Sequence, residues 1–353
     1  MYPRLLDLLR CPECLSTLEV EPLTVTADGT GEISEGLLHC GTHWYPIAGG
    51  VPRFLPGALE EHWSKLAPHM TASLERRVTG DTQATKHSIS GDPRTRENFS
   101  LEWEHHELGD RTWGIDLDAR VEYFFVSALR IPREELSGKL VLDAGCGNGS
   151  QSVAYTKLGL EVVAVDLSTG VELGHAFRHR YPEGRADRVH FVQADLQSPP
   201  FPPATFDIIH SAGVLHHTPD TERTFRRLAV TLKNDGTFYI WLYKHEPGVT
   251  PVVDSIRSVT TKMSPRTFAK VAEMAAPAFV GFCSAVNSLG IRAYPSMSRP
   301  EAALALMDIF GAPYAHAHSL PEVTRWYEEE GFKEVWGCNE SRRGFGACGR
   351  RIP

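Results

Sequence analysis

The sequence lacks both a long uninterrupted apolar stretch and an excess of basic residues. None of its 353 residues belongs to an apolar run that approaches the roughly 18 positions a helix needs to cross a bilayer, so we expect no membrane span. Acidic residues outnumber Lys and Arg, giving a net charge of −8. Because proteins that wrap a phosphate backbone usually carry a basic face, this balance disfavours nucleic acid as a partner without excluding it.

The cysteines do not form the pattern of a disulfide framework. Their number, seven, is odd; three lie near the N-terminus and four are scattered along the chain. The first ten residues, MYPRLLDLLR, have an apolar stripe but no long apolar run and no small-residue cleavage site, so they do not resemble a signal peptide. Together these features predict a reducing, cytoplasmic location.

Apolar patterning divides the chain into three parts. Residues 1–56 are compact and rich in turn signals, whereas residues 57–117 read as a polar linker with N-terminal helices. In residues 118–353, short apolar runs alternate with helical stretches, which is typical of strands buried on both faces of a parallel sheet. We predict an α/β fold with a doubly wound, mostly parallel, seven-stranded sheet.

The alternation stops after the fifth strand, which we expect to end at Tyr243. Residues 247–312 show helical patterns without a strand, so they form a predicted helical insertion. The run Ser319–Glu322 has the spacing of a capping box that opens a helix. Two last strands are expected near 333–338 and 344–349.

A glycine-rich turn follows the first strand, in the run VLDAGCGNG from Val141 to Gly149. Glycines allow a tight turn and close approach to a ligand, and the next helix offers free N–H groups. Asp166 and Asp195 end the second and third strands, where one carboxylate can accept ribose hydroxyls and the other an adenine amine. Asp143 within the loop would repel a pyrophosphate. These acids favour an adenosine cofactor that carries positive charge.

From about residue 139 to 243 the chain resembles the class I methyltransferases that depend on S-adenosylmethionine (SAM). The resemblance rests on these loop and strand-end acids, on FDIIHSAGVLHH at 206–217 and on LKNDGTFYIWLY, in the family's order and spacing. The Leu-His-His run is similar to a branch that includes ubiquinone and menaquinone biosynthesis methyltransferases. The resemblance implies an enzyme, a SAM-dependent methyltransferase.

The resemblance also implies which residues bind SAM. Gly145 and Gly147 would lie under the methionine part, with Asp143 near its amino group. The ribose would be held by the carboxylate at the second strand end and the adenine by the residues at the third. Ser211 would face the side of methyl transfer. The implied cofactor-binding residues are Asp143, Gly145, Gly147, Asn148, Asp166, Leu167, Asp195, Leu196 and Ser211.

A CxxC pair and a CxxH pair in the first part have the spacing of a metal site. Cys11, Cys14, Cys40 and His43 offer the thiolates and imidazole that zinc favours in closed structural sites. His39 is an alternative fourth ligand. The segment resembles a zinc-ribbon domain that occurs as an activator subunit of tRNA and protein methyltransferases, although that ribbon usually ends in cysteine rather than histidine. We predict one structural Zn²⁺, and surface thiols beside a chance histidine are the alternative.

Methyl transfer mainly requires alignment of the nucleophile with the methyl group, and a general base helps with some acceptors. His216 and His217 lie just past the fourth strand, so one of them is the candidate base, and a purely local packing role is the alternative. Tyr243 is a candidate catalytic residue at the end of the fifth strand. Further candidates for the acceptor pocket are Asp308, Tyr314, His316 and His318. Glu102, Trp103 and Trp113 are candidates for a lid over the cofactor.

Three functions compete at this point. The helical insertion and acidic balance favour methyl transfer to a small-molecule acceptor, through oxygen, nitrogen or carbon, in secondary or cofactor metabolism. The zinc ribbon would suit an RNA methyltransferase acting on rRNA or tRNA, and a non-catalytic scaffold is the third alternative. A homodimer is an open alternative for the assembly. The sequence identifies neither the acceptor nor the pathway.

Overall fold

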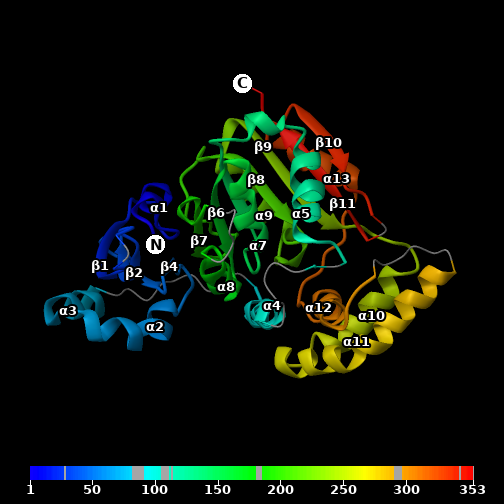
Figure 1. The fold of residues 1–353 in the computed structure, drawn as a ribbon, viewed down its shortest axis with the longest axis horizontal. Coiled ribbons are helices and arrows are strands. Elements are labelled where there is room, and N and C mark those ends of the chain that lie inside the picture. The colour runs from blue at the N-terminus through cyan, green and yellow to red at the C-terminus, as the bar shows by residue number, and fades with distance from the viewer. Residues whose placement is uncertain are drawn as a thin grey trace.

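A computed structural model describes residues 1–27, 29–81, 91–104, 111–112, 114–179, 185–289, 296–341 and 343–352. Trp113, one of the candidate lid residues, lies outside this set. Within it, two sheets and a helical hairpin give the molecule its shape (Figure 1). The strands are β1 (Glu19–Val25), β2 (Ile33–His39), β3 (Trp44–Ala48), β4 (Val51–Pro52), β5 (Leu140–Ala144), β6 (Glu161–Asp166), β7 (Val189–Gln193), β8 (Phe206–Ala212), β9 (Leu232–Tyr243), β10 (Glu334–Cys338) and β11 (Gly344–Arg350).

Helices cover the sheets and connect their strands. The longer ones are α1 (Pro3–Leu8), α2 (Ala58–Leu66), α3 (Ala72–Asp81), α4 (Arg94–Glu104), α5 (Leu117–Val121), α7 (Ser150–Tyr155), α8 (Gly170–Phe177), α9 (Thr221–Val230), α10 (Thr250–Thr260), α11 (Pro265–Ser288), α12 (Arg299–Phe310) and α13 (Leu320–Glu329). Helix α5 does not continue directly into the next helix: a π-helical turn, Glu122–Val126, separates it from the short α6 (Ser127–Leu129).

The larger sheet has the order β10-β11-β9-β8-β5-β6-β7. Its strands from β7 to β9 run parallel, whereas β11 is antiparallel to both β9 and β10. Strands β5 and β7 are buried throughout, and β6 is buried at all but its first residue, because helices cover both faces. The predicted seven-stranded, mostly parallel sheet is confirmed. Its strand order reverses between β5 and β8, and sheets of this kind bind ligands at such a point.

The predicted helical insertion is present as α10, α11 and α12. Helices α10 and α11 form a hairpin that projects beyond the sheet at the end of the molecule opposite the first sheet (Figure 1). By length and composition, α11 could cross a bilayer, although the sequence has no unbroken apolar run of that length. The capping box at Ser319 and Glu322 opens α13 as expected, with each partner bonded to the other's backbone.

The first four strands form a small antiparallel sheet that is joined to the edge of the large one. Arg53 forms a parallel bridge with Gln193 of β7, and Phe54 N–H donates to the Gln193 carbonyl at 2.8 Å. A buried ion pair joins Arg178, the residue that follows α8, to Glu32, with two contacts of 2.6 Å. Helices α2 and α3, in the predicted linker, pack against the small sheet around Trp44. The small sheet is therefore joined to the edge strand β7 of the large sheet by backbone hydrogen bonds and to the region after α8 by an ion pair.

Candidate active site

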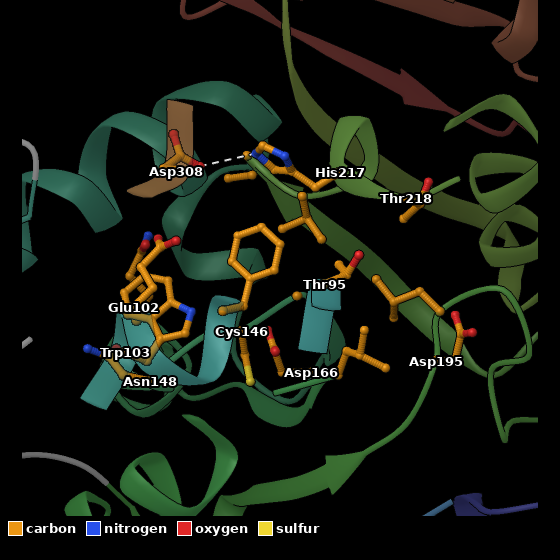
Figure 2. A pocket seen from close by; sticks show the side chains of 18 of the residues that line it. Thr95, Glu102, Trp103, Cys146, Asn148, Asp166, Asp195, His217, Thr218 and Asp308 are labelled. Atoms are coloured by element: carbon orange, nitrogen blue, oxygen red, sulfur yellow. Dashed lines mark ion pairs between the residues drawn. The ribbon is translucent and has the colours of Figure 1, made fainter. Parts of the chain in front are cut away.

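A cavity opens where the strand order reverses, at the carboxyl ends of β5, β6 and β7. Helix α4 covers one side of it and α12 contributes Asp308 (Figure 2). Seven of the sequence-predicted site residues line this cavity: Gly145, Asn148, Asp166, Leu167, Asp195, Leu196 and His217. Figure 2 shows Asp195 at the far side from Glu102 and Trp103. The structure thus brings together residues that are up to 72 positions apart in the sequence.

The glycine loop after β5 requires conformations that other residues rarely adopt. Gly145 has φ of +88° and Gly147 has φ of +56°, in the left-handed region where glycine has no steric cost. A Cβ atom on Gly147 would lie 2.5 Å from the ring of Trp103. The loop is therefore in close contact with α4, which supports the predicted covering role of Trp103.

Two carboxylates stand where an adenosine would need them. Asp166 accepts hydrogen bonds from Gly147 N–H and Ser168 N–H, both at 2.8 Å, and it is buried, which raises its pKa. Asp195 accepts from Gln197 N–H at 2.9 Å. These backbone contacts fix the orientation of each carboxylate, and carboxylate oxygens are acceptors for hydroxyl and amine groups.

Two charged side chains in the cavity had not been assigned to cofactor binding from the sequence. Glu102 is 1% exposed, and its Oε2 has no hydrogen-bond partner among the described residues. Burial and the nearby carboxylates of Asp308 and Asp166 raise its pKa well above the usual range. Arg120 of α5 is also buried and lines the cavity, and burial lowers its pKa to about 10. No carboxylate within the described part of the chain pairs with it.

These two side chains fit a zwitterionic ligand that also carries a sulfonium. A buried carboxyl with one unbonded oxygen suits a positive group, and a buried guanidinium suits a carboxylate. No sequence signal points to Arg120, because nothing in the helical pattern of α5 distinguishes it from an ordinary surface arginine. The residues present therefore fit SAM: Asp166 and Asp195 for the adenosine, Glu102 and Arg120 for the charged end.

Three of the predicted cofactor-binding residues do not line the cavity. Asp143 is buried behind the loop, where it accepts a hydrogen bond from Ser152 at 2.5 Å and lies 3.3 Å from His210 Nδ1. Gly147 faces Trp103 instead. The hydroxyl of Ser211 donates to the Ala144 carbonyl at 2.8 Å. In this structure Asp143 and Ser211 support the loop from behind, whereas Gly147 lets Trp103 of α4 approach it closely.

The two adjacent histidines have different environments. His217 reaches the cavity, its Nδ1 donates to the Tyr314 carbonyl at 2.7 Å, and its Nε2 lies 3.1 Å from Asp308 Oδ1 (Figure 2). His216 is fully buried, lies outside the cavity lining, and has a pKa well below the usual value because of burial and neighbouring positive groups. Of the two candidate bases, only His217 can touch a bound molecule in this arrangement.

Tyr243 and Asp308 complete the polar group around His217. The Tyr243 hydroxyl donates to Asp308 Oδ2, and its ring packs against His216 at a tilt of 31°, with 4.0 Å between centroids. Burial raises the pKa of Asp308, but its contacts with His217 and Tyr243 outweigh that effect and leave it below the usual value. Tyr243 does not line the cofactor cavity but faces a second cavity on the other side of α12.

The other predicted pocket residues lie around this group without entering the cofactor cavity. The Tyr314 hydroxyl accepts from Asp92 N–H at 2.9 Å. His316 N–H donates to the His216 carbonyl, and His318 N–H to the Tyr243 carbonyl, both at 2.9 Å. These bonds tie the segment before α13 to the turn after β8 and to the end of β9. The contacts of Tyr314, His316 and His318 therefore hold these parts of the chain in place relative to one another.

The four predicted metal ligands converge in the small sheet. Cys11, Cys14, Cys40 and His43 each offer a ligand atom, and all of these atoms lie within 4.8 Å of one another. The Cys14–Cys40 sulfur distance is 3.7 Å, close to the roughly 3.8 Å edge of a tetrahedron with Zn–S bonds of about 2.3 Å. Hydrogen bonding to Ser16 lowers the pKa of the Cys14 thiol to about 6. His39 instead stacks on Trp44, so the cluster fits zinc without it.

Comparison with protein families assigns the central part of the chain. Residues 142–240 match the family described as "Methyltransferase domain". The chain contains a methyltransferase domain. The match runs from within β5 to within β9 and includes the glycine loop, Asp166, Asp195 and His217.

Proteins similar to the methyltransferase domain are named for methylation in different pathways. A sterol 24-C-methyltransferase of Gibberella zeae is 32% identical over 42% of this chain and 41% of its own length. A ubiquinone biosynthesis O-methyltransferase of Azoarcus sp. is 35% identical over 30% of this chain and 44% of its own length. The chain therefore spans less than half the length of these relatives.

Among solved structures, the magnesium protoporphyrin IX methyltransferase of Synechocystis PCC 6803, with SAH bound, is similar to the methyltransferase domain and its surroundings. The sequence identity is 16% and the TM-score is 0.40, with 67% of this chain and 82% of that chain covered.

Proposed function

We propose that the protein is a SAM-dependent methyltransferase that transfers a methyl group to a small-molecule acceptor. The observation that carries the proposal is the cavity at the reversal of strand order, where Asp166, Asp195, Glu102 and Arg120 surround the glycine loop. These side chains match the charges and hydroxyls of SAM group by group. The methyltransferase family match over the same strands supports it.

The chain's own residues would bind and align the reactants. Asp166 and Asp195 would hold the adenosine, and Arg120 would bind the carboxylate of the methionine part. SAM supplies the methyl group on a positively charged sulfur, so the protein mainly has to orient the acceptor and exclude water. His217, fixed by Tyr314 and Asp308, would contact the acceptor and either orient its nucleophile or take its proton.

A small acceptor is favoured over RNA by the surroundings of the cavity. Helix α4 covers the glycine loop and α12 closes another side, which suits a molecule that enters an enclosed pocket. The relatives named for sterol and ubiquinone methylation act on small molecules. In the first sheet, the four-residue cluster would hold Zn²⁺ as a structural ion, because all four ligands come from the protein.

Two variants test the cofactor site and the role of His217. We expect Asp166→Ala to abolish SAM binding in calorimetry while circular dichroism stays unchanged, because the ribose loses its acceptor. Asp235→Ala is the matched control and should bind normally, because Asp235 is an exposed acid near the start of β9. His217→Gln should keep SAM affinity but lower turnover by about 10²–10⁴ if it handles the acceptor's proton. Unchanged SAM affinity in Asp166→Ala would contradict the cofactor assignment.

The acceptor class can be tested without knowing the acceptor. Purified protein is incubated with methyl-labelled SAM and an extract of the source cells, and labelled products are separated by size with and without ribonuclease. Label in small molecules is the expected result. Label in large, ribonuclease-sensitive material would overturn the small-molecule proposal in favour of RNA.

A further inference from the structure

The α10–α11 hairpin, residues 249–289, exposes an unusual amount of apolar surface. Of the fourteen large hydrophobic side chains that the described residues expose, eight lie on it. The eight are Val249, Val252, Ile256, Val259, Val271, Met274, Phe282 and Leu289. Met274 is 82% exposed and Leu289 is 77% exposed. Apolar surface gathered in this way, rather than scattered singly, marks an interaction site.

The charges on the hairpin are separated from its apolar end. No Asp, Glu, Lys or Arg occurs from Met274 to Leu289. The exposed cations Lys262, Arg266 and Lys270 all precede this stretch. Helix α11 is long and apolar enough to cross a bilayer, yet only 22% of its most apolar 18 residues are buried in the protein. This combination of an exposed, membrane-like helix with cations beside it is typical of helices that lie in a lipid interface.

The inner face of α11 shows how the hairpin would meet a bilayer. Ala269 and Ala272 pack in one cluster with Leu306 and Met307 of α12, against Leu101 of α4. A membrane-spanning α11 would have to give up these contacts and expose α12. The helix can keep its packing and still insert its outer side chains only if it lies along the surface, as interfacial helices do.

A cavity of about 410 Å³ lies between the hairpin, α12 and the end of β9. Apolar side chains from both hairpin helices and α12 form the larger part of its lining: Val249, Val253, Phe279, Phe282, Val286, Ile309 and Phe310. The charged residues Lys244, Glu246, Asp254, Arg257 and Arg343 also line it. Phe282 is both part of this lining and exposed on the outer surface. At its inner end the cavity reaches Tyr243, whose hydroxyl bonds to Asp308 of the cofactor cavity.

We infer that the α10–α11 hairpin docks on the surface of a lipid bilayer, with the apolar side chains of its charge-free 274–289 stretch inserted among the acyl chains. A bilayer accounts for the outer apolar surface and for the apolar side chains on the hairpin side of the cavity behind it. An acceptor with a hydrocarbon part could pass from the membrane through this cavity towards Tyr243 and Asp308. That last step rests on the proposed methyltransferase function, whereas docking itself does not.

Vesicle flotation of the full-length chain tests the inference. The vesicles contain either phosphatidylcholine alone or phosphatidylcholine with phosphatidylglycerol. Wild type should float with both and more strongly with the anionic lipid, because Lys262, Arg266 and Lys270 would lie near the headgroups. The double variant Met274→Gln/Phe282→Gln should lose about tenfold or more in partition coefficient, since two inserted apolar side chains are removed.

Val230→Gln at the end of α9 is the matched control. Like Met274 and Phe282, Val230 is an exposed apolar side chain on a helix, 51% exposed, but it lies outside the hairpin. It should float like wild type. Absence of wild-type flotation, or equal flotation of all three proteins, would overturn the inference. Wild-type self-association that the double variant loses, without vesicle binding, would overturn it in favour of a second copy of the chain.

Calorimetric SAM binding, measured on the same preparations, separates this inference from the proposed function. The hairpin variants should bind SAM as wild type does, because Met274 and Phe282 do not line the cofactor cavity. Flotation without SAM binding in wild type would leave docking supported and the methyltransferase proposal contradicted.

Discussion

Glu102 is a buried carboxyl that faces two other carboxylates in the cofactor cavity. Its pKa is raised well above the usual range, first by burial and then by Asp308 and Asp166. In the ligand-free protein it is therefore protonated over a wider pH range than an ordinary glutamate. A bound cation reverses this preference, because a positive charge nearby favours the ionised form. The proposed ligand would therefore bind together with loss of a proton from Glu102.

This linkage predicts that SAM affinity increases with pH. SAM lowers the pKa of Glu102, so affinity should rise with pH across the window between the lower pKa in the complex and the raised pKa in the free protein. Calorimetry at several pH values, in buffers of different ionisation enthalpy, would show the proton released. Glu102→Gln should flatten this dependence, and an equal pH dependence in both proteins would contradict the role of Glu102.

At the scale of elements, two glycines let helices approach the sheet closely. A Cβ on Gly174 of α8 would lie 2.4 Å from the ring of Phe191 in β7 and 3.0 Å from the Asn148 carbonyl oxygen. Gly149 meets the same phenylalanine at 2.4 Å. The glycine loop, α7 and α8 are thus held together around one ring. In contrast, Gly281 of α11 has no atom within 4 Å of its Cβ position.

The same substitution at these two sites should have opposite effects. Gly174→Ala forces an overlap with backbone and a buried ring, so we expect it to lower the free energy of unfolding by about 1–3 kcal/mol. Gly281→Ala only removes the helix penalty of glycine, so we expect a gain of up to about 1 kcal/mol. Urea unfolding of both variants measures this. A stabilised Gly174→Ala would show that α8 and β7 are less closely packed.

At the scale of the whole molecule, the small N-terminal sheet and the large sheet share one core. Leu38 and Ile47 of the small sheet belong to the same buried cluster as Val163 and Val192 of the large one. The buried Arg178–Glu32 ion pair crosses the same junction, and losing one partner of such a pair is strongly destabilising. The small sheet should therefore unfold together with the methyltransferase domain.

Removal of the metal should accordingly destabilise the entire chain. We expect a chelator, or His43→Gln, to lower the melting temperature of a single calorimetric transition, because zinc ligation contributes to folding. His39→Gln should retain the metal in elemental analysis and melt near wild type, since His39 lies outside the cluster. Two separate transitions, with the main one unchanged, would contradict a shared core.

Much of the cofactor site could be predicted from the sequence because its signals are local. The glycine turn, Asp166 and Asp195 each follow directly from a strand end, and parallel strands bring their carboxyl ends to one edge. The CxxC and CxxH pairs are likewise local signals, because the short spacing within each pair brings its two ligand side chains close together. Arg120, the environment of Glu102 and the distinction between His216 and His217 were missed, because each depends on which distant element packs against the residue.

The sequence by itself therefore determined the order of strands and helices, the cofactor loop and the cluster of metal ligands, since periodicity and spacing are properties of short segments. Only the tertiary structure decided that Asp143 and Ser211 lie behind the loop, that the small sheet joins the edge strand β7, and that the α10–α11 hairpin projects with its apolar side chains exposed. These outcomes depend on which surfaces are left uncovered after packing, and a sequence pattern shows that a face is apolar without showing what covers it.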